Sequence, residues 1–98
     1  SLVQRLYREC GIELPSVAST QGQYIVDHGL EVTEDQLEPG DLIFYSYENN
    51  QQFRNISHVA IYIGNGRMVH AANPSRGVVN DPFNPSNIGL YGRPSMSQ

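Results

Sequence analysis

Residues 57–72 constrain the fold more than any other part of this sequence, because they alternate in polarity on both sides of a Gly-Asn-Gly turn. Alternation with period two, interrupted by glycine and asparagine, predicts two antiparallel strands joined by a tight turn. His58 lies on the first of these strands and His70 on the second. Whether the two imidazoles meet depends on the strand register.

Two registers are compatible with the turn. A two-residue loop at 65–66 pairs Gly64 with Arg67 and sends the two imidazoles to opposite faces. A three-residue loop at 64–66 shifts the pairing by one residue, so that Ile63 faces Arg67 and the histidines share a face. The histidine face then carries His58, Ala60, Tyr62, Met68, His70 and Ala72, and the other face carries Val59, Ile61, Ile63, Val69 and Ala71. Because the second face is apolar throughout, the three-residue loop is predicted.

In this register the histidines are diagonal neighbours with backbones about 7–8 Å apart, within reach of each other's side chains. Ala60 and Ala72 leave room beside them for another group. A metal site needs three or four ligands, and only His28, Cys10 and scattered acids remain, none at ligand spacing. We therefore expect no metal and no cofactor. A two-histidine phosphoesterase needs Ser or Thr two residues after each histidine, where this chain has alanine.

A cysteine nucleophile with a histidine base is the remaining chemistry. Cys10 is the only thiol in the sequence. It falls in an apolar helical stripe with Leu2, Val3 and Leu6, away from any helix N-terminus that would acidify it. Cys10 is therefore predicted to be a buried core residue.

The remaining pattern predicts an α+β fold in one domain spanning residues 1–98. Helices are expected from Leu2 to Cys10, with Ser1 as a candidate N-cap, and from Val17 to about Val26. Strands are expected at residues 41–46, 58–63, 67–72, 77–80 and 88–93, with connections or loops at 27–40, 47–55 and 81–87.

Charge divides the chain into two unlike halves. Residues 1–41 hold eight acids against two arginines, whereas residues 42–98 hold two acids against four arginines. The arginine fork suits carboxylates, so Arg54, Arg67 and Arg76 are candidate ligands for an anionic substrate. A net charge of −4 without a basic run argues against nucleic acid, and no apolar run is long enough to span a membrane.

Several segments together resemble a known family. They are Leu2-Val3-Gln4, Tyr7, Gly11-Ile12, Leu14-Pro15, Leu37, Pro39-Gly40-Asp41-Leu42-Ile43-Phe44, Ser57-His58-Val59-Ala60-Ile61-Tyr62-Ile63-Gly64-Asn65-Gly66 and Val69-His70-Ala71. In order and spacing they are similar to the NlpC/P60 family, papain-like cysteine peptidases that cut the stem peptides of bacterial peptidoglycan. The resemblance implies N-terminal helices packed on an antiparallel sheet of about five strands.

The resemblance also implies site roles. His58 corresponds to the general base of the family and His70 to the third, orienting residue. The nucleophile cysteine of the family falls two residues before Ser1, so the chain is expected to lack that N-terminal part of the domain. Ser16 replaces the usual arginine after Leu-Pro, and Ala60 replaces a more common glycine.

The function implied is a cysteine endopeptidase of the extracellular bacterial cell wall that cleaves the γ-D-glutamyl–diamino acid bond of stem peptides. Additional wall-binding or N-terminal domains are expected in the parent protein. Two alternatives stay open: a non-catalytic peptidoglycan-binding or scaffold module of the same fold, and a related amidase or acyltransferase.

Overall fold

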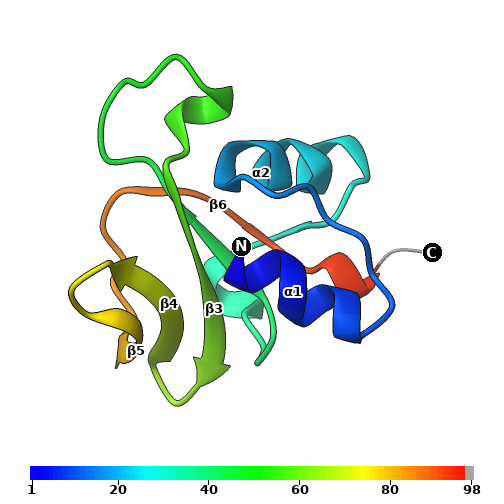
Figure 1. Cartoon of the computed structure of the whole chain (residues 1–98). Coiled ribbons are helices and arrows are strands. Elements are labelled where there is room, and N and C mark those ends of the chain that lie inside the picture. The colour runs from blue at the N-terminus through cyan, green and yellow to red at the C-terminus, as the bar shows by residue number, and fades with distance from the viewer. Residues whose placement is uncertain (97–98) are drawn as a thin grey trace.

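Two short helices pack on one face of a six-stranded antiparallel sheet in the computed structural model, which describes residues 1–96 (Figure 1). The elements are α1 Leu2–Glu9, α2 Ala18–Asp27, β1 Glu31–Val32, β2 Leu42–Tyr45, β3 His58–Gly64, β4 Arg67–Asn73, β5 Gly77–Pro82 and β6 Ile88–Gly92, with 3₁₀ turns η1 Glu34–Gln36, η2 Phe53–Asn55 and η3 Pro94–Met96. The strand order is β1-β6-β2-β3-β4-β5. This arrangement confirms the α+β prediction, with the short β1 added inside the expected connection 27–40.

Helix α1 begins with a complete capping box. The backbone N–H of Gln4 donates to Ser1 Oγ at 3.2 Å, as the N-cap prediction requires. Val3 is buried, but the rest of the predicted stripe is not: Leu6 is 44% exposed and Cys10 is exposed. The prediction of a buried Cys10 is therefore wrong: α1 packs on the core through Val3 and Tyr7, and Cys10, its C-cap, is exposed.

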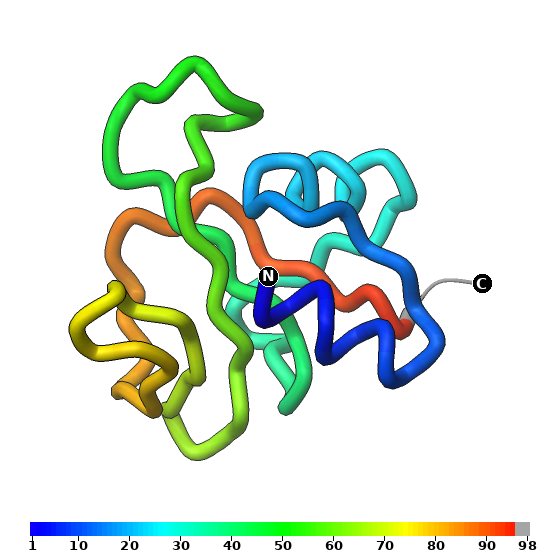
Figure 2. The backbone as a smooth tube through the Cα atoms, viewed as in Figure 1, coloured from blue at the N-terminus to red at the C-terminus, as the bar shows by residue number. Residues whose placement is uncertain are grey.

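Hydrophobic residues fill both faces of the sheet. The face toward the helices holds a cluster of Val3, Leu14, Ile25, Leu30, Leu42, Phe44, Ile56, Ile61 and Leu90. The opposite face holds Val32, Ile43, Tyr45, Ala60, Met68 and Tyr91. Alternation along β2 places its successive residues in the two clusters in turn, which is why all four are buried. The tube in Figure 2 shows the chain from 47 to 57 rising above this sheet as a separate loop.

The β3–β4 hairpin combines parts of both predicted registers. Tyr62 pairs with Met68 as predicted, but the turn is the two-residue loop 65–66, with Gly64 opposite Arg67. Ile63 is the extra residue of a β-bulge. Beyond the bulge, away from the turn, the strands pair as predicted, with Ile61 opposite Val69. The predicted pairing of Ile63 with Arg67 and the three-residue loop are therefore wrong. Nor is the second face all core: Ile63 is 39% exposed and Ala71 is exposed.

A buried ion pair joins the start of β2 to the end of β6. Arg93 donates from Nε to Asp41 Oδ1 at 2.8 Å and from Nη2 to Oδ2 at 2.9 Å. The same carboxylate accepts the backbone N–H of Glu38 at 2.8 Å. Nearby, the hydroxyl of Tyr7 donates to the carbonyl of Gly40, which ties α1 to this turn. The Pro-Gly-Asp-Leu sequence thus holds one end of the sheet together.

The edge strand β5 is longer than predicted and reaches Pro82, so Asp81 lies on a strand opposite Met68 instead of in a loop. Within residues 1–96, no helix is both long and apolar enough to cross a membrane.

Candidate active site

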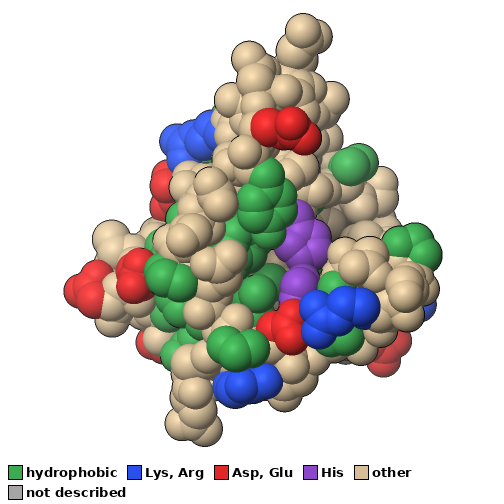
Figure 3. All heavy atoms as spheres, turned by 90° about the vertical axis from the view of Figure 1, so that its left-hand side faces the viewer, with side chains coloured by type: hydrophobic (Ala, Val, Ile, Leu, Met, Phe, Trp, Pro, Cys, Tyr) green, Lys and Arg blue, Asp and Glu red, His purple; other side chains and the backbone are tan. Residues whose placement is uncertain are grey.

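The two histidines predicted to meet are in direct contact. His58 opens β3 and His70 lies in β4, and His58 Nε2 is 2.7 Å from His70 Nδ1. The imidazole planes cross at 72° with centroids 4.9 Å apart, which is an edge-on arrangement. His70 is only 9% exposed, whereas His58 is partly open. Figure 3 shows the histidines side by side in a hollow of the surface.

The pKa of His58 is lowered from its ordinary value of 6.5, first by burial and second by the neighbouring His70. A lowered pKa keeps this imidazole neutral, and therefore able to accept a proton, at neutral pH. Within residues 1–96, Nδ1 of His58 makes no hydrogen bond, in contrast to Nε2. The free ring nitrogen is thus the one available to a reacting group.

A carboxylate continues the chain of contacts beyond His70. His70 Nε2 is 2.9 Å from Asp81 Oδ2, and the guanidinium of Arg76 contacts both oxygens of that carboxylate, at 3.0 and 3.2 Å. Hydrogen bonds from Arg76 and His70 lower the pKa of Asp81 to about 2. Asp81 was not among the predicted site residues, because the sequence placed it in a loop. The feature that could have identified Asp81 as a site residue is the register of β4 and β5, in which His70 pairs with Val79, two residues before Asp81.

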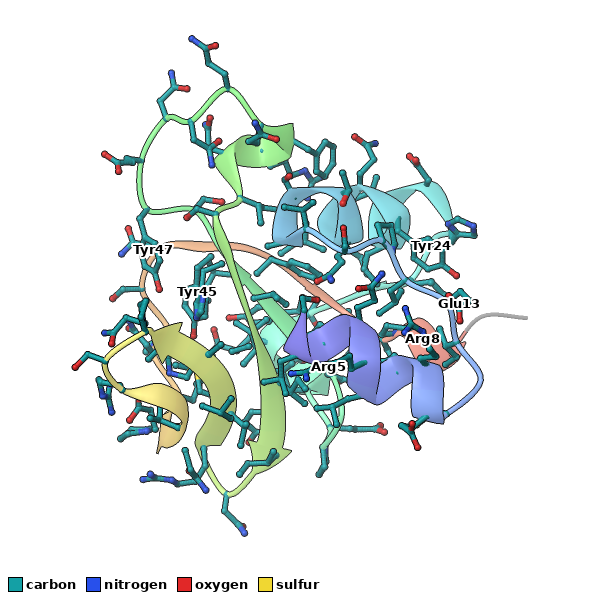
Figure 4. All side chains as sticks on the ribbon, viewed as in Figure 1. Arg5, Arg8, Glu13, Tyr24, Tyr45 and Tyr47 are labelled. Carbon is teal, nitrogen blue, oxygen red and sulfur yellow. The ribbon has the colours of Figure 1, made fainter. Side chains whose placement is uncertain are left out.

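Two tyrosines flank His58. Tyr45 pairs with His58 across β2 and β3, and Tyr47 stacks on Tyr45 with ring centroids 5.7 Å apart. The centroid of the Tyr47 ring is 6.5 Å from that of His58. Figure 4 shows the two tyrosines together on the opposite side of β3 from α1 in that view. Both rings thus lie close to His58, whose pKa is lowered first by burial.

A pocket of about 200 Å³ connects His58 with the beginning of α1. Its lining combines three segments: Ser1, Leu2 and Val3; Ser16, Val17 and Ala18; and Ser57, His58 and Val59, together with Ala71. Gln21, which is fully buried, donates to Ser1 Oγ at 3.2 Å and to the carbonyl of Pro15 at 2.8 Å. These bonds hold the helix N-terminus next to the imidazole.

Cys10 lies at the other end of α1, as its C-cap. It lines a separate, mostly apolar pocket with Leu6, Tyr7 and Ile12. The N-terminus of α1, which adjoins His58, is at the opposite end of the helix from Cys10. The structure therefore does not bring the single cysteine of the chain to the histidines.

The three arginines proposed from charge do not converge on one point. Arg54 Nη1 is 3.3 Å from Glu31 Oε2, and Arg67 donates to the side chain and backbone oxygens of Asn80 at 2.8 and 3.0 Å. Only Arg76 is connected to the histidines, through Asp81. Among residues 1–96, no group of three or more His, Cys, Asp or Glu side chains is placed to hold a metal ion.

Comparison with known proteins agrees with this fold and these motifs. The model of the NlpC/P60 family matches residues 1–89. A similar solved structure is that of an NlpC/P60 family protein from Bacillus cereus, with a TM-score of 0.76 and 29% identity, covering 93% of this chain and 29% of that one. The chain belongs to the NlpC/P60 family, which confirms the resemblance and the α+β fold.

Relatives within the family differ in activity. The γ-D-glutamyl-L-lysine dipeptidyl-peptidase of Bacillus cereus is 33% identical over 79 residues, which are 81% of this chain and 22% of that protein. RipD of Mycobacterium tuberculosis, a non-catalytic NlpC/P60 domain protein adapted to peptidoglycan binding, has a TM-score of 0.66 and 26% identity, covering 89% of this chain and 58% of that one. The family thus includes peptidases and peptidoglycan hydrolases as well as a non-catalytic protein.

Proposed function

We propose that this chain is part of the catalytic domain of a bacterial cell-wall cysteine endopeptidase. Its substrate is the stem peptide of peptidoglycan, cleaved at the γ-D-glutamyl–diamino acid bond. The observation that carries the proposal is the 2.7 Å contact between His58 and His70, beside a pocket at the N-terminus of α1. The γ-D-glutamyl-L-lysine specificity named for the Bacillus cereus relative supports the choice of bond.

In the proposed reaction, His58 is the general base and His70 the orienting residue. Nδ1 of His58 takes the proton of a cysteine thiol, and the thiolate attacks the scissile carbonyl carbon. The protonated imidazole then gives its proton to the leaving amine, and water hydrolyses the thioester. His70 holds the imidazole of His58 in place through the contact between its own Nδ1 and Nε2 of His58.

The nucleophile is proposed to be a cysteine of the parent protein, two residues before Ser1. The pocket between His58 and residues 1–3 supports this place, since a thiol there adjoins both the base and the helix N-terminus. Cys10 is eleven residues after that position, about 16 Å away along a helix at 1.5 Å per residue, and does not substitute for it. Residues 1–98 by themselves are accordingly expected to be inactive.

Arg54, Arg67 and Arg76 are proposed contacts for substrate carboxylates. Each guanidinium has five N–H donors. Within residues 1–96, Arg54 uses one donor for Glu31, whereas Arg67 and Arg76 each use two for Asn80 and Asp81. Donors therefore remain on all three for an anionic ligand. In the parent protein, Arg54→Ala and Arg67→Ala are each expected to raise the KM for muropeptides. If these variants hydrolyse muropeptides as well as the unsubstituted protein does, this part of the proposal is contradicted.

Two alternatives use the same fold. RipD supports a non-catalytic peptidoglycan-binding module. In that case the position two residues before Ser1 is not a cysteine, and muropeptides are bound without being cut. A related amidase or acyltransferase keeps the histidine pair but acts on a different bond. We place the protein at the cell wall outside the cytoplasm because the proposed substrate is there.

The test uses the parent protein, with the residues that precede Ser1, and muropeptides analysed by mass spectrometry. Cleavage between D-glutamate and the diamino acid is expected. His58→Gln is expected to lower kcat on the order of 10²- to 10⁴-fold. His28→Gln is the matched control, because His28 is exposed and its ring hydrogen-bonds to and stacks on Tyr24, away from the histidine pair. Binding without cleavage, or full activity of His58→Gln, overturns the proposal.

A further inference from the structure

Behind the histidine pair lies a third polar group. The carboxylate of Asp81, at the end of edge strand β5, contacts His70 at the ring nitrogen that faces away from His58. The three side chains therefore form one continuous row, in which each imidazole uses Nε2 toward the next group. The family resemblance assigned no role to Asp81, and neither did the sequence pattern.

Asp81 is held in place as an ion. Arg76 donates from Nη2 to Oδ1 at 3.0 Å and from Nη1 to Oδ2 at 3.2 Å, so both carboxylate oxygens face a cation. The 3.2 Å contact and the 2.9 Å contact with His70 share the same oxygen, Oδ2. An ionised carboxylate has no proton to donate and acts only as an acceptor.

This acceptor determines the direction of every hydrogen bond in the row. His70 must carry its proton on Nε2 in order to donate to Asp81 Oδ2. Neutral His70 then has a lone pair on Nδ1, so that atom accepts from Nε2–H of His58. Neutral His58 with its proton on Nε2 has its lone pair on Nδ1, the nitrogen without a partner among residues 1–96.

We infer that Asp81 is a positioning residue that sets the tautomer of both histidines, with Arg76 holding its carboxylate in place. The inference rests on the proposed function in one respect: an unprotonated Nδ1 on His58 is what a general base for a thiol needs. When His58 becomes cationic during the reaction, Asp81 also supplies a negative charge two hydrogen bonds away. Asp81 does not touch the substrate; it acts through His70.

A purely structural role predicts something different. If the Arg76–Asp81 pair only closes the turn between β4 and β5, then removing the carboxylate loosens that turn and leaves the protonated nitrogens of the imidazoles unchanged. The tautomer state therefore separates the two roles. It can be measured on residues 1–98 without catalysis, by long-range proton–nitrogen correlation NMR with isotope-labelled histidine.

The first measurement needs no variant. At about pH 8, above the ordinary imidazole pKa, His58 and His70 of the unsubstituted residues 1–98 are both expected to be protonated on Nε2 alone. A proton on Nδ1 of either residue overturns the inference. The exposed His28 provides an internal reference within the same spectrum.

The second measurement uses matched variants. In Asp81→Asn the amide can present either its oxygen or its NH₂ group to His70, so mixed tautomers are expected at both histidines. Asp81→Glu restores a carboxylate and is expected to recover the Nε2–H form at least in part. Glu48→Gln removes one charge at an exposed position and is expected to change neither histidine. Unchanged tautomers in a folded Asp81→Asn, checked by its amide spectrum, contradict the inference.

Activity of the parent protein completes the test. Asp81→Asn is expected to lower kcat by on the order of 10²-fold, because the base His58 loses its fixed tautomer. Equal kcat in a folded Asp81→Asn protein overturns the inference. If the predicted tautomers are present but no stem peptide is cut, the proposed function fails while the assignment of Asp81 to the tautomers stands. The two failures are thus distinguishable.

Discussion

His58 Nε2 lies 2.7 Å from His70 Nδ1, although the two residues are twelve positions apart on different strands. The bulge at Ile63 makes this contact possible. With the turn at residues 65–66 and no bulge, the side-chain alternation would send the imidazoles to opposite faces of the sheet. One extra residue in β3 therefore determines whether the candidate active site exists.

The turn that follows the bulge requires a backbone conformation at Gly66 that residues with a side chain rarely adopt. Gly66 has φ +70° with open space where a Cβ would lie, so Gly66→Ala tests backbone conformation alone. A loss of about 1 kcal/mol in the free energy of unfolding is expected, because an L-residue pays for the left-handed conformation. Urea unfolding measures it. Asn65→Gly, at φ +56°, is the control and is expected to stay within about 0.5 kcal/mol of the parent.

The lowered pKa of His58 links the stability of the fold to pH. Its folded-state pKa is below the ordinary value of 6.5, so the unfolded chain binds the proton more readily. This contribution to stability is fully present above pH 6.5 and is lost as the pH falls from there through the folded-state pKa. Urea unfolding between about pH 5 and pH 8, on either side of the ordinary imidazole value, should therefore show a smaller unfolding free energy at the acidic end.

His58→Gln removes this component, so its unfolding free energy should depend less on pH than that of the parent. His28→Gln is the matched control for loss of a histidine elsewhere in the chain. An equal pH dependence in the parent and in His58→Gln contradicts the assignment. A separate titration of the His58 ring by proton NMR should give a midpoint below 6.5.

Breaking the Asp41–Arg93 pair should strongly destabilise the fold. Asp41 is 1% exposed, and its carboxylate is matched by the fork of Arg93 and by the backbone N–H of Glu38. Asp41→Ala leaves Arg93 without that partner, and a loss of about 3–5 kcal/mol is expected in the free energy of unfolding. Glu38→Gln alters an exposed, 3.6 Å contact with Arg93 and should change stability by less than about 1 kcal/mol. Similar effects of the two variants would contradict the expectation.

Close packing of Gly92 against Ile25 predicts a coupled pair of substitutions. A Cβ at Gly92 would lie 2.6 Å from Cδ1 and Cγ1 of Ile25, which is fully buried. Gly92→Ala is expected to cost about 1–3 kcal/mol in unfolding free energy through overpacking. Ile25→Ala by itself is expected to cost about 2–5 kcal/mol.

The two changes are expected not to add, because Ile25→Ala removes the atoms that clash with the new methyl group. A double-mutant cycle by urea unfolding should give a coupling of about 0.5 kcal/mol or more in favour of the double variant. Simple additivity would show that the backbone of β6 moves away instead.

Local pattern was enough to predict a good part of this protein. Period-two alternation located β3 and β4, and Ser1 as a candidate N-cap identified the start of α1. The sorting of apolar residues also predicted a shared face for His58 and His70, but through a three-residue loop where the structure has a bulge. The positions of these strands and of the helix start depend on residues a few positions apart. They can therefore be predicted without knowledge of the tertiary structure. The family motifs supported the prediction of the α+β fold class.

Other features were decided only by the tertiary structure. The exposure of Cys10 and the contact between His70 and Asp81 depend on how segments further apart in the sequence pack, and the bulge at Ile63 depends on the pairing of β3 with β4. Asp81 reaches His70 because β5 extends to Pro82 in register with β4. The sequence around Asp81 does not predict that pairing. The sequence therefore predicted the two imidazoles, whereas long-range strand pairing supplied the carboxylate that orders their protons.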